Sequence, residues 1–106
     1  MDRGYQLVFY TEESRIHNHQ TFGGWILEIV RSMHIRGATL IKANEGIGRS
    51  HRLHSAQFFD QADQPVIVTV VVSEEECDRL LKRINVEENL RLFYTKIPVE
   101  FGLIGG

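Results

Sequence analysis

The sequence predicts an α+β fold with two amphipathic helices and four strands. Apolar residues recur at helical spacing from Phe22 to Met33 and again from Cys77 to Ile84. Between these two stretches lies Val66–Val72, a run of mostly β-branched residues that is typical of a strand. With further strands at either end, the order becomes β-α-β-β-α-β, which is the plan of a ferredoxin-like βαββαβ sandwich.

The boundaries of the first three elements follow from local signals. We expect the first strand over Tyr5–Thr11, where Tyr, Val, Leu and Phe are frequent. Gly23 and Gly24 should weaken the first turn of the following helix, because glycine is a poor helix former. We expect that helix to end near Gly37, since glycine is common just after a helix, and the second strand to cover Thr39–Ala43.

The second helix has a clear start. Ser73 and Glu76 match the capping box, in which a hydroxyl and a carboxylate each bond a backbone N–H group of the first turn. The fourth strand should cover Leu90–Phe101. It contains Pro98, and because proline is tolerated mainly on edge strands, we expect this strand at an edge of the sheet.

Val66–Val72 is apolar on both faces, although a sheet with helices on one side and water on the other should alternate. We therefore expect another subunit to cover the second face. A charge at the strand centre, Val70→Asp, should then abolish assembly and folding.

Composition narrows the classes of function. The chain has 106 residues, 25% of them charged, and a net charge of −2, so we expect one domain over residues 1–106 that binds no nucleic acid. No apolar run is long enough for membrane insertion. The single cysteine, Cys77, excludes an internal disulfide and favours a cytoplasmic protein.

A glycine-rich segment after the second strand is a candidate anion site. Gly46 and Gly48 form a Gly-x-Gly pair, and consecutive backbone N–H groups in such a turn can cradle an anion. Arg49 and Arg52 follow and could hold a phosphate or carboxylate. The alternatives are a plain turn and solvated loop charges.

Histidines in the same loop are candidate metal ligands. His51 and His54 form one polar pair, to which His17 and His19 could add. No cysteine pair or helical His-Glu motif accompanies them, so surface histidines that titrate near neutral pH are the favoured alternative.

Phe58 and Phe59 are two aromatic residues in a polar loop, where they could either anchor the loop or contact a partner. By contrast, Phe22 and Trp25 share the helix stripe and are expected in the core. No nucleophile–base constellation is recognisable, so the protein is not expected to be an enzyme.

The order and spacing of several motifs resemble the PII superfamily of trimeric signalling proteins, and more closely its PII-like branch, domain of unknown function 190. The residues that carry the resemblance are Gly37-Ala-Thr-Leu40, Glu45-Gly-Ile-Gly48, His51, His54, Pro65-Val-Ile67 and the capped helix at Ser73.

The resemblance implies a homotrimer with a small-molecule effector, typically an adenine nucleotide, in clefts between subunits. Gly37 and Thr39 match positions that line this cleft in relatives. The loop over Glu45–Gln64 would sense the ligand and contact a target, such as a membrane transporter or an enzyme. No required cofactor is implied.

The chain departs from PII proteins proper at the loop that grips the phosphates. The matching stretch, Asn85–Arg91, has no glycine or lysine and carries two carboxylates, which would repel a triphosphate. Two alternatives remain open: a divalent-metal-binding trimer resembling the cation-tolerance proteins, and an adaptor that works without a ligand.

Overall fold

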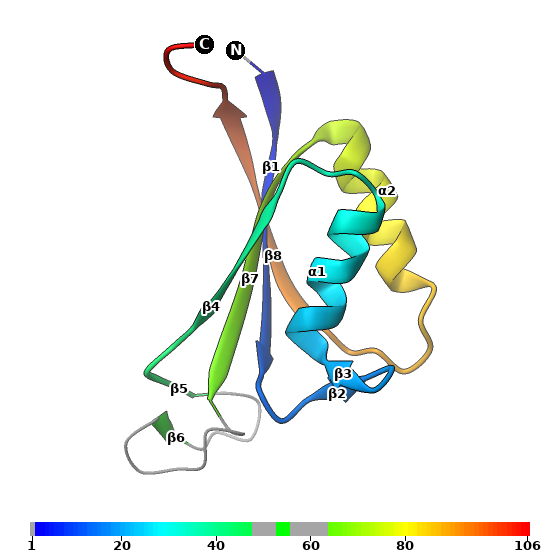
Figure 1. The fold of residues 1–106 in the computed structure, drawn as a ribbon, viewed down its shortest axis with the longest axis vertical. Coiled ribbons are helices and arrows are strands. Elements are labelled where there is room, and N and C mark those ends of the chain that lie inside the picture. Colours follow the sequence, from blue (N-terminus) through cyan, green and yellow to red (C-terminus); the bar gives the residue numbers. More distant parts are fainter. Residues whose placement is uncertain (1, 48–52, 56–63) are drawn as a thin grey trace.

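The computed structural model describes residues 2–47, 53–55 and 64–106. Its main elements follow the predicted order βαββαβ (Figure 1). They are β1 (Asp2–Glu12), α1 (Phe22–Ser32), β4 (Ala38–Lys42), β7 (Pro65–Ser73), α2 (Glu74–Asn85) and β8 (Phe93–Phe101). Two short hairpins complete the described chain: β2 (Ile16–His17) with β3 (Gln20–Thr21), and β5 (Glu45–Ile47) with β6 (Leu53–Ser55).

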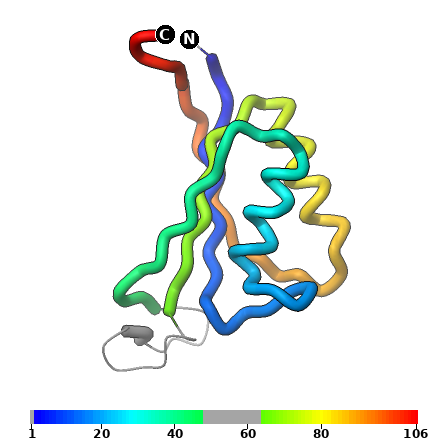
Figure 2. The backbone as a smooth tube through the Cα atoms, viewed as in Figure 1, coloured from blue at the N-terminus to red at the C-terminus, as the bar shows by residue number. Residues whose placement is uncertain are grey.

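The main strands form one antiparallel sheet in the order β4-β7-β1-β8. Both helices pack on the same face of this sheet, and the two ends of the chain lie close together at one end of the molecule (Figure 2). Strand β8 is an edge strand, which confirms the position expected from Pro98.

The core lies between the helices and the sheet. Phe22 and Trp25 are both buried there, as predicted, in an edge-to-face contact with ring centroids 5.3 Å apart. The central strands β1 and β7 contribute alternate residues to this core, and α2 contributes the apolar stripe predicted from Cys77 to Ile84. The fully buried members include Leu7, Phe9, Val68, Val72, Cys77 and Leu80.

The start of α1 is regular, so the prediction of a weak first turn is wrong. Thr21 is the N-cap, and its hydroxyl accepts a hydrogen bond of 3.2 Å from the Gly24 N–H group. A Cβ atom on Gly23 would lie 2.8 Å from Leu40 Cδ1 and 3.3 Å from Val66 Cγ1. The helix backbone therefore lies close against the sheet at Gly23, and a larger side chain would displace the end of Leu40.

The end of α1 also differs from the prediction, because the helix stops at Ser32 and not near Gly37. His34 has a φ of 58°, the left-handed conformation usually taken by glycine. Its N–H donates to the Arg31 carbonyl at 3.1 Å, and the Ile35 N–H donates to the Val30 carbonyl at 3.2 Å. These two bonds form a Schellman motif centred on a histidine.

The other face of the sheet is apolar and is covered by no described helix. Ile67, Thr69 and Val71 of β7 lie on it, whereas Val66, Val68, Val70 and Val72 face the core. Neighbouring strands add the exposed residues Tyr10, Ile41, Phe93 and Ile97. Val70 is 2% exposed and faces the core, so a charge there acts on folding first, whereas Val71 is the adjacent residue on the open face.

The capping box of α2 is confirmed. The Glu76 N–H donates to Ser73 Oγ at 3.1 Å, and the Ser73 N–H donates to Glu76 Oε1 at 2.9 Å.

Ser73→Ala should lower the free energy of unfolding by about 1 kcal/mol, because it leaves the Glu76 N–H without its acceptor. Urea denaturation followed by circular dichroism measures this change. Ser14→Ala, in an exposed turn, is the matched control and should have no measurable effect. Equal unfolding curves for the two variants would contradict the prediction.

Candidate ligand-binding cleft

An open cleft of about 960 Å³ lies at the end of the molecule that carries the termini. The start of β1, the connection before β4, the end of β7, the first turns of α2 and the end of β8 all contribute to it. Its residues include Gln6, Gly37, Thr39, Thr69, Val71, Ser73 and Phe101. Two of the predicted ligand residues, Gly37 and Thr39, therefore line one cavity.

In this cleft, β7 extends past the first residue of β4. This residue, Ala38, pairs with Val70, so Val71–Ser73 of β7 have no described strand partner on that side. Strand backbone groups left without a partner are available to a ligand. Beside them, the Thr69 hydroxyl accepts a hydrogen bond of 3.3 Å from the Gln6 side chain.

Gly37 leaves room at the mouth of the cleft. A Cβ atom placed on it would have no atom within 4 Å. The residue therefore borders open space rather than packing against the core, which is the setting that a ligand position requires.

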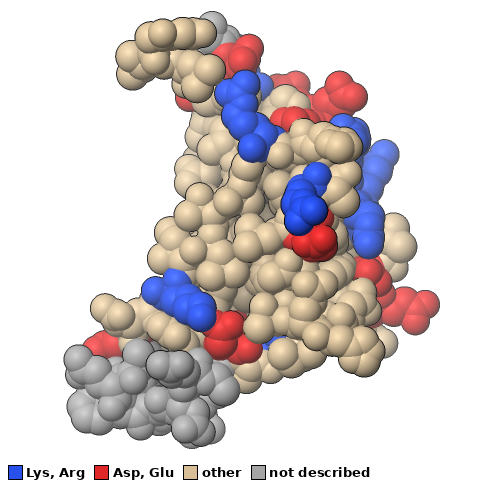
Figure 3. Space-filling model, viewed as in Figure 1, with Lys and Arg blue, Asp and Glu red and all other residues tan. Residues whose placement is uncertain are grey.

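Charged residues of both signs line the cleft. The basic residues are Arg3, Arg36 and Arg79, and the acidic residues are Asp2, Glu75 and Glu76. In Figure 3, basic and acidic side chains both gather toward this end of the molecule. Sequence reasoning missed the arginines because they lie far apart along the chain; only Arg36, directly before Gly37, carried a local signal.

Gly46 lies elsewhere. It is part of β5, at the opposite end of β4 from Gly37, and it pairs with His54 of β6 (Figure 1). Its backbone is extended, so the prediction of a turn at this residue is wrong. A Cβ atom here would lie 2.9 Å from Pro65 Cγ, which explains the glycine by close packing. Its contact with a ligand stays a prediction.

The remaining predicted residues of this loop, Gly48, Arg49, His51, Arg52, Phe58 and Phe59, lie outside the described residues. Within Glu45–Gln64, β5 and β6 pair as an antiparallel hairpin.

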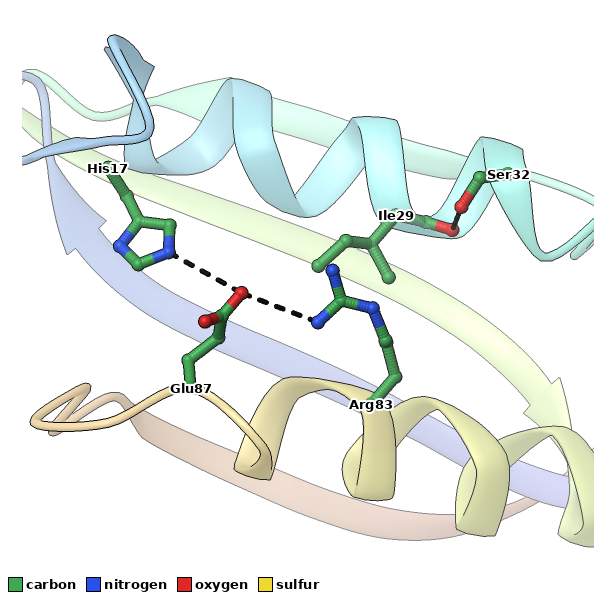
Figure 4. A network of polar contacts seen from close by, with 5 residues as sticks. All are labelled: His17, Ile29, Ser32, Arg83 and Glu87. Carbon is green, nitrogen blue, oxygen red and sulfur yellow. Dashed lines mark hydrogen bonds and ion pairs between the residues drawn. The ribbon is translucent and has the colours of Figure 1, made fainter.

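His17 has a packing role. Asn18 and His19, with φ of 50° and 65°, form the two-residue turn between β2 and β3. The His17 ring lies 4.3 Å from the Trp25 ring, and its Nε2 lies 3.7 Å from Glu87 Oε1, which also contacts Arg83 (Figure 4). Among residues 2–47 and 64–106, no three His, Cys, Asp or Glu side chains are grouped to hold a metal ion.

The stretch Asn85–Arg91 borders a second cavity of about 590 Å³, together with Leu81, Leu92 and Tyr94. The Arg15 side chain donates to the Leu90 carbonyl and so fixes this connection to the segment before α1. Within one chain, this stretch and Gly37 therefore line different cavities.

Comparison with known proteins identifies the family. Residues 4–92 match the family of domain of unknown function 190, described as "Uncharacterized ACR". The chain belongs to this family. It is also 26% identical over 84 residues to the UPF0166 protein of Aquifex aeolicus (strain VF5), which covers 78% of this chain and 80% of the relative.

Solved structures share the fold of this family member. CPII, a nitrogen regulatory PII-like protein from Thiomonas intermedia K12, was solved bound to ADP, AMP and bicarbonate. It matches with a TM-score of 0.65 and 15% identity, over 94% of this chain and 96% of CPII. A putative PII-like signaling protein from Thermus thermophilus matches with a TM-score of 0.58 and 23% identity, over 93% of this chain and 89% of that one.

These matches confirm the predicted PII-like, ferredoxin-like fold. In the described part of the chain, no helix has the length and apolar character needed to span a membrane.

Proposed function

We propose that this protein is a homotrimeric, non-enzymatic PII-like regulator that binds an adenine nucleotide in the cleft lined by Gly37 and Thr39. The observation that carries the proposal is the cleft itself, which combines an unpaired strand edge at Val71–Ser73 with guanidinium groups. Backbone donors and acceptors suit the polar edge of a purine, and guanidinium groups suit phosphate.

The apolar open face of the sheet supports the trimer. Val71, Ile97 and Phe93 are 40%, 50% and 63% exposed in the single chain, and they lie on strands that share this face. Burial of such residues stabilises an assembly by about 25 cal/mol per Å² of apolar surface. Subunits that pack through this face would bring the cleft of one chain next to its neighbour, because Thr39, Thr69 and Val71 belong to both surfaces.

The kind of ligand is proposed from the fold relatives, since CPII was solved with ADP and AMP. The hairpin-bearing loop over Glu45–Gln64 would contact a target protein, such as a transporter or an enzyme, with Phe58 and Phe59 as contact residues. In an assembly, Gly46, Gly48, Arg49 and Arg52 would approach the ligand from this loop. We place the protein in the cytoplasm on the basis of its single, buried cysteine.

Gly37→Val should weaken nucleotide binding by about tenfold or more, because it adds a branched side chain where the cleft is open. Isothermal titration calorimetry with AMP, ADP and ATP measures the affinity. Ser14→Val, in an exposed turn, is the control for added bulk and should bind like the wild type.

Two results would contradict the proposed function. One is the absence of heat for every nucleotide at millimolar concentration with the wild-type protein. The other is equal affinity of the wild type and Gly37→Val, which would remove this cleft as the binding site.

A further inference from the structure

Three arginines reach the cleft from three separate elements. Arg3 lies near the start of β1, Arg36 directly precedes Gly37 and β4, and Arg79 lies in the second turn of α2. All three side chains are exposed. The fold thus gathers guanidinium groups that are up to 76 positions apart in the sequence.

Within the described residues, none of these three guanidinium groups takes part in an ion pair, a hydrogen bond or a ring contact. Several other basic residues do: Arg83 pairs with Glu87, Lys42 pairs with Glu13, and Lys96 lies over the Tyr5 ring. Three arginines without a partner among the described residues therefore line one cleft, together with carboxylates.

The nearby carboxylates have identifiable positions. Glu76 is bonded to the Ser73 N–H group, so its charge is engaged at the start of α2. Glu75 lies four residues before Arg79, a spacing at which helical Glu–Arg pairs commonly form, yet no such pair is present between these two described residues. Asp2 and Glu75 thus line the same cleft without forming an ion pair with any of these three described arginines.

We propose that Arg3, Arg36 and Arg79 form a binding site for a phosphate or diphosphate group. Guanidinium groups donate two parallel hydrogen bonds to such oxygens, and charge-assisted bonds are about twice as strong as neutral ones. Asp2 and Glu75 repel the additional charges of a longer chain, so the site selects a mono- or diphosphate over a triphosphate. That the phosphate belongs to a nucleotide rests on the proposed function; the anion site itself does not.

The test compares four ligands by calorimetry: AMP, ATP, adenosine and inorganic pyrophosphate. The variants are Arg36→Ala and Arg79→Ala, with Arg31→Ala as control. Arg31 is an exposed arginine in the last turn of α1, and it does not line the cleft. We expect AMP and pyrophosphate to bind each cleft variant about tenfold more weakly, adenosine to be unaffected, and wild-type affinity for AMP to exceed that for ATP.

The outcomes separate this inference from the proposed function. Unchanged AMP and pyrophosphate affinity in both cleft variants, or an equal loss in Arg31→Ala, would overturn the arginine site and leave the nucleotide proposal standing. Arginine-dependent pyrophosphate binding without nucleotide binding would support the site and overturn the nucleotide. If neither ligand binds the wild type, both fail.

Discussion

Gly4→Ala is expected to lower the free energy of unfolding by about 3 kcal/mol, although it adds a single methyl group. A Cβ atom on this residue of β1 would lie 1.9 Å from the Val72 carbonyl oxygen and 2.8 Å from its carbon. These are backbone atoms of the neighbouring strand, so no side-chain rotation relieves the overlap. The two central strands would have to separate where they pair, near Gly4 and Ser73.

Denaturant unfolding of the purified variants measures this effect. Gly102→Ala is the matched control, since a Cβ atom there has no neighbour within 4 Å. We expect the control to unfold like the wild type. A Gly4→Ala protein with the same midpoint and slope as Gly102→Ala would show that the two strands tolerate the methyl group.

The second large effect comes from introducing aspartate at either of two adjacent positions, and the comparison separates folding from assembly. Val70→Asp places a carboxylate in the core, where Val70 is 2% exposed, and should cost more than about 4 kcal/mol and prevent folding. Val71→Asp places the same group on the open face, where Val71 is 40% exposed, and should leave a folded monomer. The wild type is expected to be a trimer.

Light scattering coupled to size exclusion gives the mass, and circular dichroism reports folding. A wild-type monomer at micromolar concentration would remove the trimer, and a trimeric Val71→Asp protein would place the interface elsewhere. A folded Val70→Asp protein would contradict the assignment of this residue to the core.

The element order could be predicted because local signals agreed with the tertiary structure. The apolar stripe from Phe22 to Met33, the capping box at Ser73 and the edge position of Pro98 each follow from short-range rules. All three are found in the structure.

Glycines were misleading because their roles depend on packing between distant segments. Gly37 looked like a helix stop, but His34 takes the left-handed position, since the Schellman bonds outweigh the moderate cost of that conformation in a histidine. At Gly23 a side chain would contact β4 and β7, and at Gly46 it would contact Pro65. Such contacts are invisible in a single sequence.

Part of the cleft could be predicted as well. Gly37 and Thr39 were found through the family resemblance, and the structure places both in one cavity. Arg3 and Arg79 could not be found, because they line one cavity only once α2 has packed on the sheet that contains β1.

The buried thiol of Cys77 allows the opening of this protein to be followed by alkylation. Burial is the main cause that raises the pKa of this fully buried group, with a smaller opposing effect from Lys96, so the folded protein holds it as an unreactive neutral thiol. The raised pKa contributes to the free energy of unfolding in full at pH values below the pKa of the unfolded thiol. This contribution is lost as the pH rises toward the pKa of the thiol in the folded protein. As the chain has one cysteine, each molecule can be alkylated once at this thiol, and when alkylation is slower than reclosing the labelling rate reports the fraction of molecules in which Cys77 is exposed.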